Sequence, residues 1–221
     1  MTKADFISRT MQIMNELGWD DISSGAFFNS DATKVEKHIE SVFVDAWRKA
    51  TALFPKVYFE SRDFSASKLT YDISTGTGFI LLPADFYLLF SFKMKGWQKR
   101  VETAYLFSDP IASVQANEYT RGNHIRPVVI RTIKPVLTRE GDNFVTKMKD
   151  ALEYYSLPKG KVHQVEEAIY IPLIQPLSDE TILNEKLIAP LAYLCASQVF
   201  IIFEKSEIAK VLELKATEII R

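Results

Sequence analysis

The chain contains 221 residues, and 47% of them are hydrophobic, a size and composition typical of one globular core or of a core with a large insertion. Its 27 basic and 28 acidic side chains almost cancel, which excludes an overall charge that favours nucleic acid or an anionic membrane. The single cysteine, Cys195, excludes an internal disulfide and leaves too few thiols for a cysteine-based zinc site.

Two helices are predicted within the first 55 residues. Thr2 and Asp5 have the spacing of a capping box, and Gly18 would end that first helix. Asp31 would begin the second helix and Pro55 would end it. A helical repeat of apolar residues predicts its buried face: Val35, Ile39, Val42, Phe43, Ala46, Trp47, Ala50, Leu53 and Phe54. The N-terminal residues include no apolar segment of the secretory type, so we expect synthesis in a cytoplasm.

From Lys56 to Gln175 the pattern changes to short β-like segments separated by turn-forming residues. The strand candidates are residues 57–59, 79–82, 88–94, 100–104, 128–133, 151–157 and 168–174. Both flanks are helical, and strands do not alternate regularly with helices. The sequence therefore predicts an α+β chain, in which residues 1–55 and 176–221 form a helical bundle around a mostly antiparallel β insertion at 56–175.

The C-terminal segment is the most apolar part of the chain. Ser178 and Asp179 are typical of a helix start, and Pro190 predicts a kink in the helix that follows. The pattern breaks at residues 204–206, and a last helix is expected from about Glu207, with Ile208, Val211, Leu212 and Ile219 facing inward. We expect these two helices to pack as a hairpin.

The apolar run in this segment approaches the roughly 20 residues that span a bilayer. Glu185 and Lys186 interrupt its start, Ser197 and Gln198 lie in its middle, and charged residues follow it directly. These interruptions favour a buried core helix over a membrane span.

Candidate chemistry is sparse in the sequence. Gly76-Thr77-Gly78 lacks the further residues of a dinucleotide-binding or P-loop motif, so a hairpin turn is favoured over a phosphate cradle. His38, His124 and His163 are too dispersed to suggest a metal site, and Cys195 lies on an apolar helix face, where a small buried hydrophobe is favoured over a nucleophile. We expect no catalytic residue, no cofactor and no metal.

Basic residues are concentrated at 121–139, a stretch without acidic residues, and a second basic group at 93–100 surrounds Trp97. Such segregation in a chain of balanced charge is typical of a surface that meets phosphates or an acidic protein, although an ordinary solvated surface has the same pattern. The candidate interface or DNA-contacting residues are Trp97, Arg121, Arg126, Arg131, Lys134 and Arg139. The content of 15 Phe and nine Tyr also favours contact surfaces and oligomerisation.

Two stretches together carry a resemblance to a known family. The first is Leu82-Pro83-Ala84-Asp85-Phe86, followed by an apolar strand and a turn at Lys95-Gly96-Trp97. The second is the C-terminal hairpin from Leu191 to Ala216. In their order, spacing and flanking helices they resemble the head-to-tail connector, or tail adaptor, proteins of tailed bacteriophages, particularly short-tailed ones.

The resemblance implies a structural virion protein without catalytic residues. It implies a homo-oligomeric ring, commonly of twelve copies, that lies at the portal–tail junction, contacts the portal protein and other tail or ring proteins, and lets double-stranded genomic DNA pass. The DNA contact would be weak, no membrane would be involved, and synthesis would occur in the cytoplasm of the bacterial host. The alternative hypothesis is a nucleic-acid-binding module that uses residues 121–139.

Overall fold

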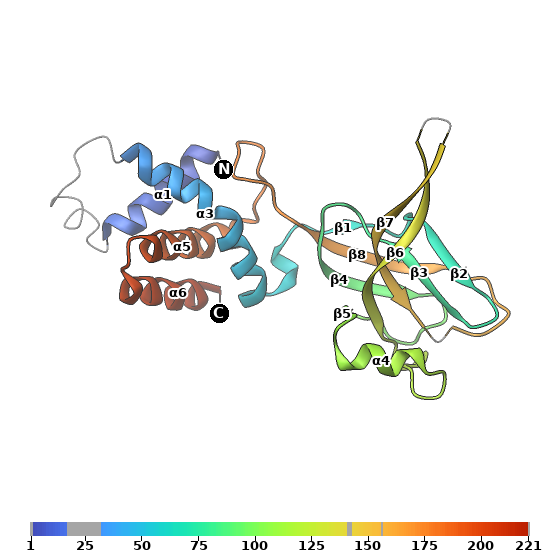
Figure 1. Ribbon diagram of the computed structural model, residues 1–221. Helices are drawn as coiled ribbons and strands as arrows, with labels where there is room; N and C mark the ends of the chain where they lie inside the picture. Colours follow the sequence, from blue (N-terminus) through green and yellow to red (C-terminus); the bar gives the residue numbers. More distant parts are fainter. Residues whose placement is uncertain (1, 17–31, 141–142, 156, 221) are drawn as a thin grey trace. The chain divides into compact units, whose positions relative to one another are not determined.

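The computed structural model describes residues 2–16, 32–140, 143–155 and 157–220, and it is a mixed α+β chain, as predicted (Figure 1). The chain divides into two compact units. The helical unit comprises residues 1–60 and 174–221, and the β unit comprises residues 61–173. The expected boundaries were at 55/56 and 175/176.

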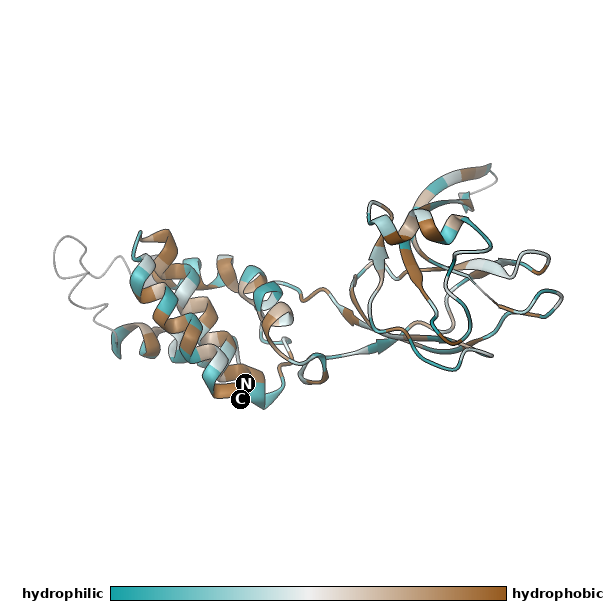
Figure 2. Ribbon diagram, turned by 90° about the horizontal axis from the view of Figure 1, so that it is seen from below, coloured by the Kyte–Doolittle hydropathy of each residue, from teal (hydrophilic) through white to brown (hydrophobic). Residues whose placement is uncertain are grey.

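Four α-helices of the helical unit are described: α1 (Lys3–Glu16), α3 (Ala32–Leu53), α5 (Glu185–Ile202) and α6 (Ser206–Ile220). Helix α5 packs against α1, α3 and α6, and most of its residues are buried, although its length and composition would also suit a membrane span. Hydrophobic residues recur along these helices at the spacing that builds a buried face (Figure 2). Phe6 of α1 meets Phe43 of α3 edge to face, with ring centroids 5.5 Å apart.

The ends of α1 and α3 follow largely from local sequence. The predicted capping box of α1 is present: Asp5 N donates to Thr2 Oγ1 (3.1 Å) and Thr2 N donates to Asp5 Oδ2 (3.0 Å), which lowers the pKa of Asp5. The predicted face of α3 is buried from Val35 to Phe54, except for Leu53, which is half exposed. The expected roles of Gly18 and Asp31 fall outside the described residues.

Helix α5 begins later than predicted. Asn184 is its N-cap, and its side chain accepts a hydrogen bond from Lys186 N (3.0 Å). Ser178 instead belongs to a turn in which its backbone N–H donates to Thr181 Oγ1 (2.9 Å), so the prediction of a helix start at Ser178 was wrong. Ser, Thr, Asp and Asn side chains accept hydrogen bonds from backbone N–H groups both in turns and at helix starts. Which of the two forms depends on the residues that follow.

The predicted break between α5 and α6 is confirmed. Glu204 takes a positive φ of 59°, and its N–H donates to the Ile201 carbonyl (3.0 Å) while Lys205 N donates to Phe200 O (2.9 Å). This pattern is a Schellman motif, which usually has glycine at the left-handed position. Helix α6 buries Ala209, Leu212 and Ala216. Val211 and Ile219, expected to face inward, are about half exposed because they lie off that narrow stripe.

The β unit contains two sheets. One has the order β1 (Arg62–Asp63), β8 (Val165–Pro172), β4 (Phe86–Met94). The other has the order β2 (Leu69–Asp72), β3 (Thr77–Leu81), β7 (Asn143–Tyr154), β6 (Val129–Glu140), β5 (Tyr105–Leu106). All described pairs are antiparallel except β5 with β6, so the mostly antiparallel insertion is present.

Several local predictions in this region were wrong. Residues 56–58 form a 3-10 turn instead of a strand, and only Val101 of segment 100–104 makes a β-bridge, with Phe92. Strands β1 and β2 were not predicted, and neither was the short helix α4 (Pro110–Ala116). Each is only two to seven residues long, too short for a periodic pattern to identify.

The two sheets enclose a common core. Leu89, Phe92, Ala168 and Tyr170 come from the first sheet, and Ile80, Val129, Leu152 and Tyr154 come from the second. All eight side chains are buried. The base of strands β6 and β7 is therefore fixed inside this core.

Candidate assembly interface

Strands β6 and β7 form a long two-stranded ribbon, from the Val129–Tyr154 pair to the Glu140–Asn143 pair. At the base, β5 pairs with β6 at residues 130–131, and β3 pairs with β7 at residues 151–154. Residues 132–140 and 143–149, which we call the distal ribbon, pair with each other, and Figure 1 shows them projecting beyond the other strands of the β unit.

The ribbon has two distinct faces, because side chains alternate along a strand and directly paired residues share a face. At the base, one face buries Val129, Leu152 and Tyr154 in the core. Further out, the same face carries four large apolar side chains, which we call the ribbon stripe: Ile133, Leu137, Phe144 and Met148. They are 58%, 67%, 72% and 64% exposed, respectively. The face that builds the core thus continues as an exposed apolar surface.

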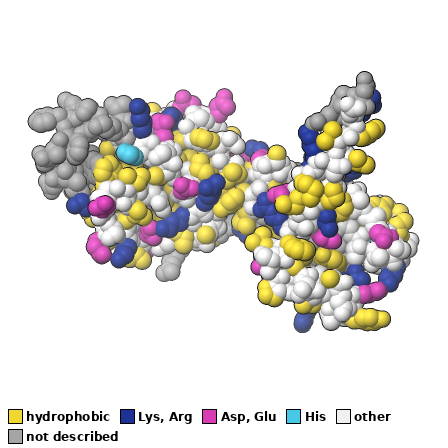
Figure 3. Space-filling model, viewed as in Figure 1, with side chains coloured by type: hydrophobic (Ala, Val, Ile, Leu, Met, Phe, Trp, Pro, Cys, Tyr) yellow, Lys and Arg dark blue, Asp and Glu magenta, His cyan; other side chains and the backbone are white. Residues whose placement is uncertain are grey.

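In the space-filling view, hydrophobic side chains line the projecting ribbon, and basic side chains lie beside them (Figure 3). Large apolar side chains that adjoin one another on a monomer surface are typical of contacts with another molecule. Pro135 lies between Ile133 and Leu137 and has no backbone N–H to offer a further strand. The ribbon stripe therefore suits side-chain docking better than extension of the sheet.

The signal for this stripe in the sequence is weak. A strand was expected at 128–133, and the ladder continues to Glu140 through Pro135. The alternation of Ile133, Pro135 and Leu137 was the available sign of a longer strand. The turn expected at residues 141–143 lies mostly outside the described residues, but Glu140 and Asn143 are paired.

The basic residues of segment 121–139 do not gather on one surface. Arg131 and Arg139 lie on the stripe face of β6 and Lys134 lies on the opposite face, whereas Arg121 and Arg126 precede the strand. Arg131 pairs with Asp150 (2.7 Å) and stacks over Phe86, and Lys134 pairs with Glu153 (2.9 Å).

The loop between α4 and β6 holds the remaining two candidates. Arg121 is largely covered and lies 3.9 Å from Glu118, and Glu118 also pairs with Lys159. The hydrogen bond from Lys159 lowers the pKa of Glu118. Arg126 is exposed, and its backbone N–H donates to Asn123 Oδ1 (3.0 Å). The segment is therefore a series of local ion pairs and turns instead of a continuous basic surface.

Trp97 was expected at an interface and lies instead in the core of the β unit. Its side chain is 3% exposed, and it contacts the rings of Phe92 (5.8 Å) and Tyr154 (6.4 Å). The prediction assumed that Trp97 shares the exposure of the basic residues around it. At the turn, Gly96 has a φ of 101°, and the indole of Trp97 is buried while the neighbouring Lys95 is exposed. Trp97 cannot contact a partner without unfolding of the core.

The motif at residues 82–86 has a structural explanation. Asp85 accepts hydrogen bonds from the Tyr170 hydroxyl (2.8 Å) and from Arg62 (2.9 Å), and its carbonyl accepts from Leu173 N (2.7 Å). Burial and the bond to Asp85 raise the pKa of Tyr170. Hydrogen bonds to Asp85 thus connect β1 and the end of β8 to the start of β4.

A buried polar group lies at the base of the ribbon. His163 is buried, its Nδ1 lies 2.8 Å from the Tyr154 hydroxyl, and its ring stacks on Tyr71 (4.6 Å). Burial lowers the pKa of His163, and nearby Asp72 opposes the shift. His163 Nε2 has no hydrogen-bond partner among the described residues. This geometry favours the neutral imidazole.

The other sequence candidates have structural roles. Gly76 lies in the turn between β2 and β3 with a φ of 69°, and an added Cβ would lie 2.1 Å from the Leu157 carbonyl, so the predicted hairpin turn is confirmed. Cys195 is buried in α5, and burial raises the pKa of its thiol. His38 contacts the ring of Phe203 (5.4 Å).

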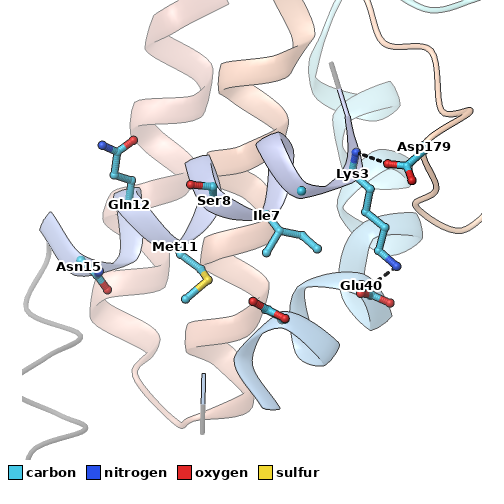
Figure 4. Close-up of a pocket in the computed structure, with 10 residues that line it drawn as sticks. Lys3, Ile7, Ser8, Met11, Gln12, Asn15, Glu40 and Asp179 are labelled. Carbon is cyan, nitrogen blue, oxygen red and sulfur yellow. Dashed lines mark hydrogen bonds and ion pairs between the residues drawn. The ribbon is translucent and has the colours of Figure 1, made fainter. Parts of the chain in front are cut away.

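An open hollow lies beside α1, lined by Ile7, Ser8, Met11, Gln12 and Asn15 and by charged residues of both signs (Figure 4). Lys3 N donates to Asp179 (3.0 Å), and Lys3 Nζ pairs with Glu40 (2.9 Å) at its edge. These contacts join α1 to α3 and to the segment before α5, and the mixed lining favours no ligand class. Within the described residues, no group of three His, Cys, Asp or Glu side chains could hold a metal ion.

Comparison with protein-family models gives no match for the chain, and no match is found among curated protein sequences.

Proposed function

We propose that the chain is a structural virion protein, which forms an oligomeric ring between the portal and the tail of a tailed bacteriophage and acts as a conduit for genomic DNA. In this proposal the N- and C-terminal helices form a bundle that serves as the body of each subunit. The β unit provides contacts between subunits, and the chain has no catalytic role.

One observation carries the proposal: the core-facing side of the β6–β7 ribbon continues as an exposed apolar stripe. Ile133, Leu137, Phe144 and Met148 would contact water in an isolated chain, at a cost of about 25 cal/mol for each Å² of apolar surface. Covering them with another molecule recovers that free energy. The resemblance of residues 82–97 and of the C-terminal hairpin to phage connectors supports a ring as the resulting assembly.

The nucleic-acid-binding alternative has less support. Arg131 and Lys134 are paired with acidic residues of the same chain, and the basic residues of β6 are divided between its two faces. A protein that neutralises several phosphates binds DNA with a strong salt dependence, and it needs basic side chains that converge on one surface. A conduit for DNA instead favours weak contact.

The test is the mass and shape of the assembly that the purified 221-residue chain forms, measured by native mass spectrometry and electron microscopy. Closed rings are the expected result. A monomer at every concentration would overturn the proposal, and salt-sensitive binding of that monomer to duplex DNA would favour the alternative.

A further inference from the structure

We infer that the ribbon stripe of one copy docks on the outer face of helix α6 of a second copy, in a head-to-tail contact. The inference rests on the proposed function, because it names the surfaces through which the copies would assemble. It commits to a second copy of this chain as the partner, and it follows from the spacing, exposure and charge of the residues on the two surfaces.

The receiving surface is a single line along α6. Glu207, Val211, Leu214 and Glu218 recur at intervals of four, three and four residues, so they lie along one side of the helix. Val211 and Leu214 are exposed in the middle of this line, and Leu214 is 63% exposed. An acidic residue lies at each end of it. We call these four residues the α6 line.

The two surfaces match in pattern. The ribbon stripe places Leu137 and Met148 at the centre of the distal ribbon, and Arg139 lies near them on the same face, whereas Lys147 and Lys149 lie on the opposite face. Apolar side chains would thus meet apolar side chains, and Arg139 would meet Glu218, since Glu207 already pairs with Lys210 (3.2 Å). Interfaces commonly have this arrangement, with an apolar centre and a polar rim.

The charges of the two units favour a head-to-tail contact. The helical unit has 12 basic and 16 acidic residues, a formal charge of −4, and the β unit has 15 basic and 12 acidic residues, a formal charge of +3. Two β units therefore repel each other, as do two helical units, whereas the β unit of one copy attracts the helical unit of another. This difference favours ribbon-to-helix docking over pairing of two ribbons.

A head-to-tail contact also has the symmetry that the proposed function needs. It uses two different surfaces on each copy, so one ribbon and one α6 line always remain available at the ends of a growing assembly. Such a contact produces a closed ring when the rotation between copies closes, and a filament when it does not.

The first experiment removes the apolar part of the contact. Leu137→Thr combined with Met148→Thr keeps residues that favour strands and eliminates two exposed apolar side chains. We expect the dissociation constant between copies, measured by analytical ultracentrifugation of the full chain, to rise at least about tenfold, as for truncation of a central interface residue. The matched control is Leu106→Thr with Val162→Thr, two exposed apolar side chains of the β unit outside the ribbon.

The second experiment tests the charges. Arg139→Glu on the stripe face of the ribbon should weaken association, and so should Glu218→Lys on α6. Combining the two changes should restore association, because the charges at the two positions are then exchanged. Lys161→Glu alters the charge of the β unit equally without touching the ribbon, and separates a specific contact from the effect of net charge.

The outcomes distinguish this inference from the proposed function. If the wild-type chain assembles, and the ribbon and α6 changes weaken assembly while their combination restores it, the inference is supported. A ring that persists in the Leu137→Thr, Met148→Thr variant would overturn the inference and leave the proposed function intact. Failure of the Arg139→Glu, Glu218→Lys variant to recover would exclude the α6 line as the partner surface, and a wild-type chain that stays monomeric would overturn both.

Discussion

The base and the distal half of the β6–β7 ribbon have the same backbone geometry and different surroundings. At the base, Leu152 is fully buried between two sheets. Fifteen residues earlier in the chain and on the same face, Leu137 is 67% exposed. Neighbouring strands cover the base, and they end before the distal ribbon.

In the proposed assembly, a single alternating pattern serves folding at one end of the ribbon and association at the other. An isolated two-stranded hairpin is marginally stable in water, so an exposed ribbon gains order when its apolar face meets a partner. Variants of the base and of the distal half test whether the two halves have these separate roles.

Trp97→Ala should destabilise the β unit by about 3–5 kcal/mol, because it removes a large buried side chain beside Tyr154 at the base. Urea unfolding monitored by circular dichroism would measure the loss. Trp97→Phe is the control and should cost much less, since Trp97 Nε1 has no hydrogen-bond partner among the described residues. An unchanged midpoint for the alanine variant would mean that Trp97 is not part of the core.

Leu152→Ala and Leu137→Ala form a matched pair on one face of the ribbon. The first should cost about 2–5 kcal/mol of unfolding free energy and the second less than about 0.5 kcal/mol, because only the first leaves a cavity. Both are measured by urea unfolding at concentrations too low for association. Equal losses of unfolding free energy at the two positions would contradict the conclusion that only the base of the ribbon contributes to the core.

Acid should weaken the base through His163. Burial holds the pKa of His163 below its ordinary value of 6.5, so the unfolded chain binds the proton more readily. The stability that neutral His163 confers is therefore fully present above about pH 6.5 and is lost as the pH falls towards the folded-state pKa. Melting temperatures of wild type and His163→Gln between pH 5 and 8 should differ in slope, with the weaker dependence in the variant. Parallel curves would mean that His163 does not cause the loss of stability in acid.

Lys149→Glu should slightly stabilise the isolated chain. Lys149 is directly opposite Lys134 on the face away from the stripe, and a favourable cross-strand pair is worth about 0.2–1 kcal/mol. Lys161→Glu, outside the ribbon, is the control for the change in charge. Urea unfolding of the monomer would measure the effect, and a loss of stability relative to this control would contradict the register of the distal ribbon.

Much of the local structure was predictable because it depends on neighbouring residues. The capping box at Thr2 and Asp5, the face of α3 and the break at residue 204 follow from the helical period and from side chains that satisfy nearby backbone groups. The turn at Gly76 was predictable because glycine readily adopts the positive φ that Gly76 has there. The α+β class also follows from these patterns.

The candidate site was predicted only in part. Residues 121–139 were singled out for their charge, and this segment does contain half of the ribbon, but the exposed apolar residues were not recognised. Ion pairs such as Arg131 with Asp150 form across strands, so they could not be inferred from the basic segment alone. Trp97 was misassigned for the same reason, since its exposure depends on distant strands.

Helices and strands could be located from the residues alone, because backbone periods and caps act over a few residues. Which apolar side chains are covered depends instead on how distant segments pack. Leu152 and Leu137 occupy equivalent places in one alternating pattern, and they differ because β3 pairs with β7 at residues 151–154 and does not extend along the distal ribbon. Burial depends on pairing between residues far apart in the chain, and that pairing separates the core of this protein from its proposed contact surface.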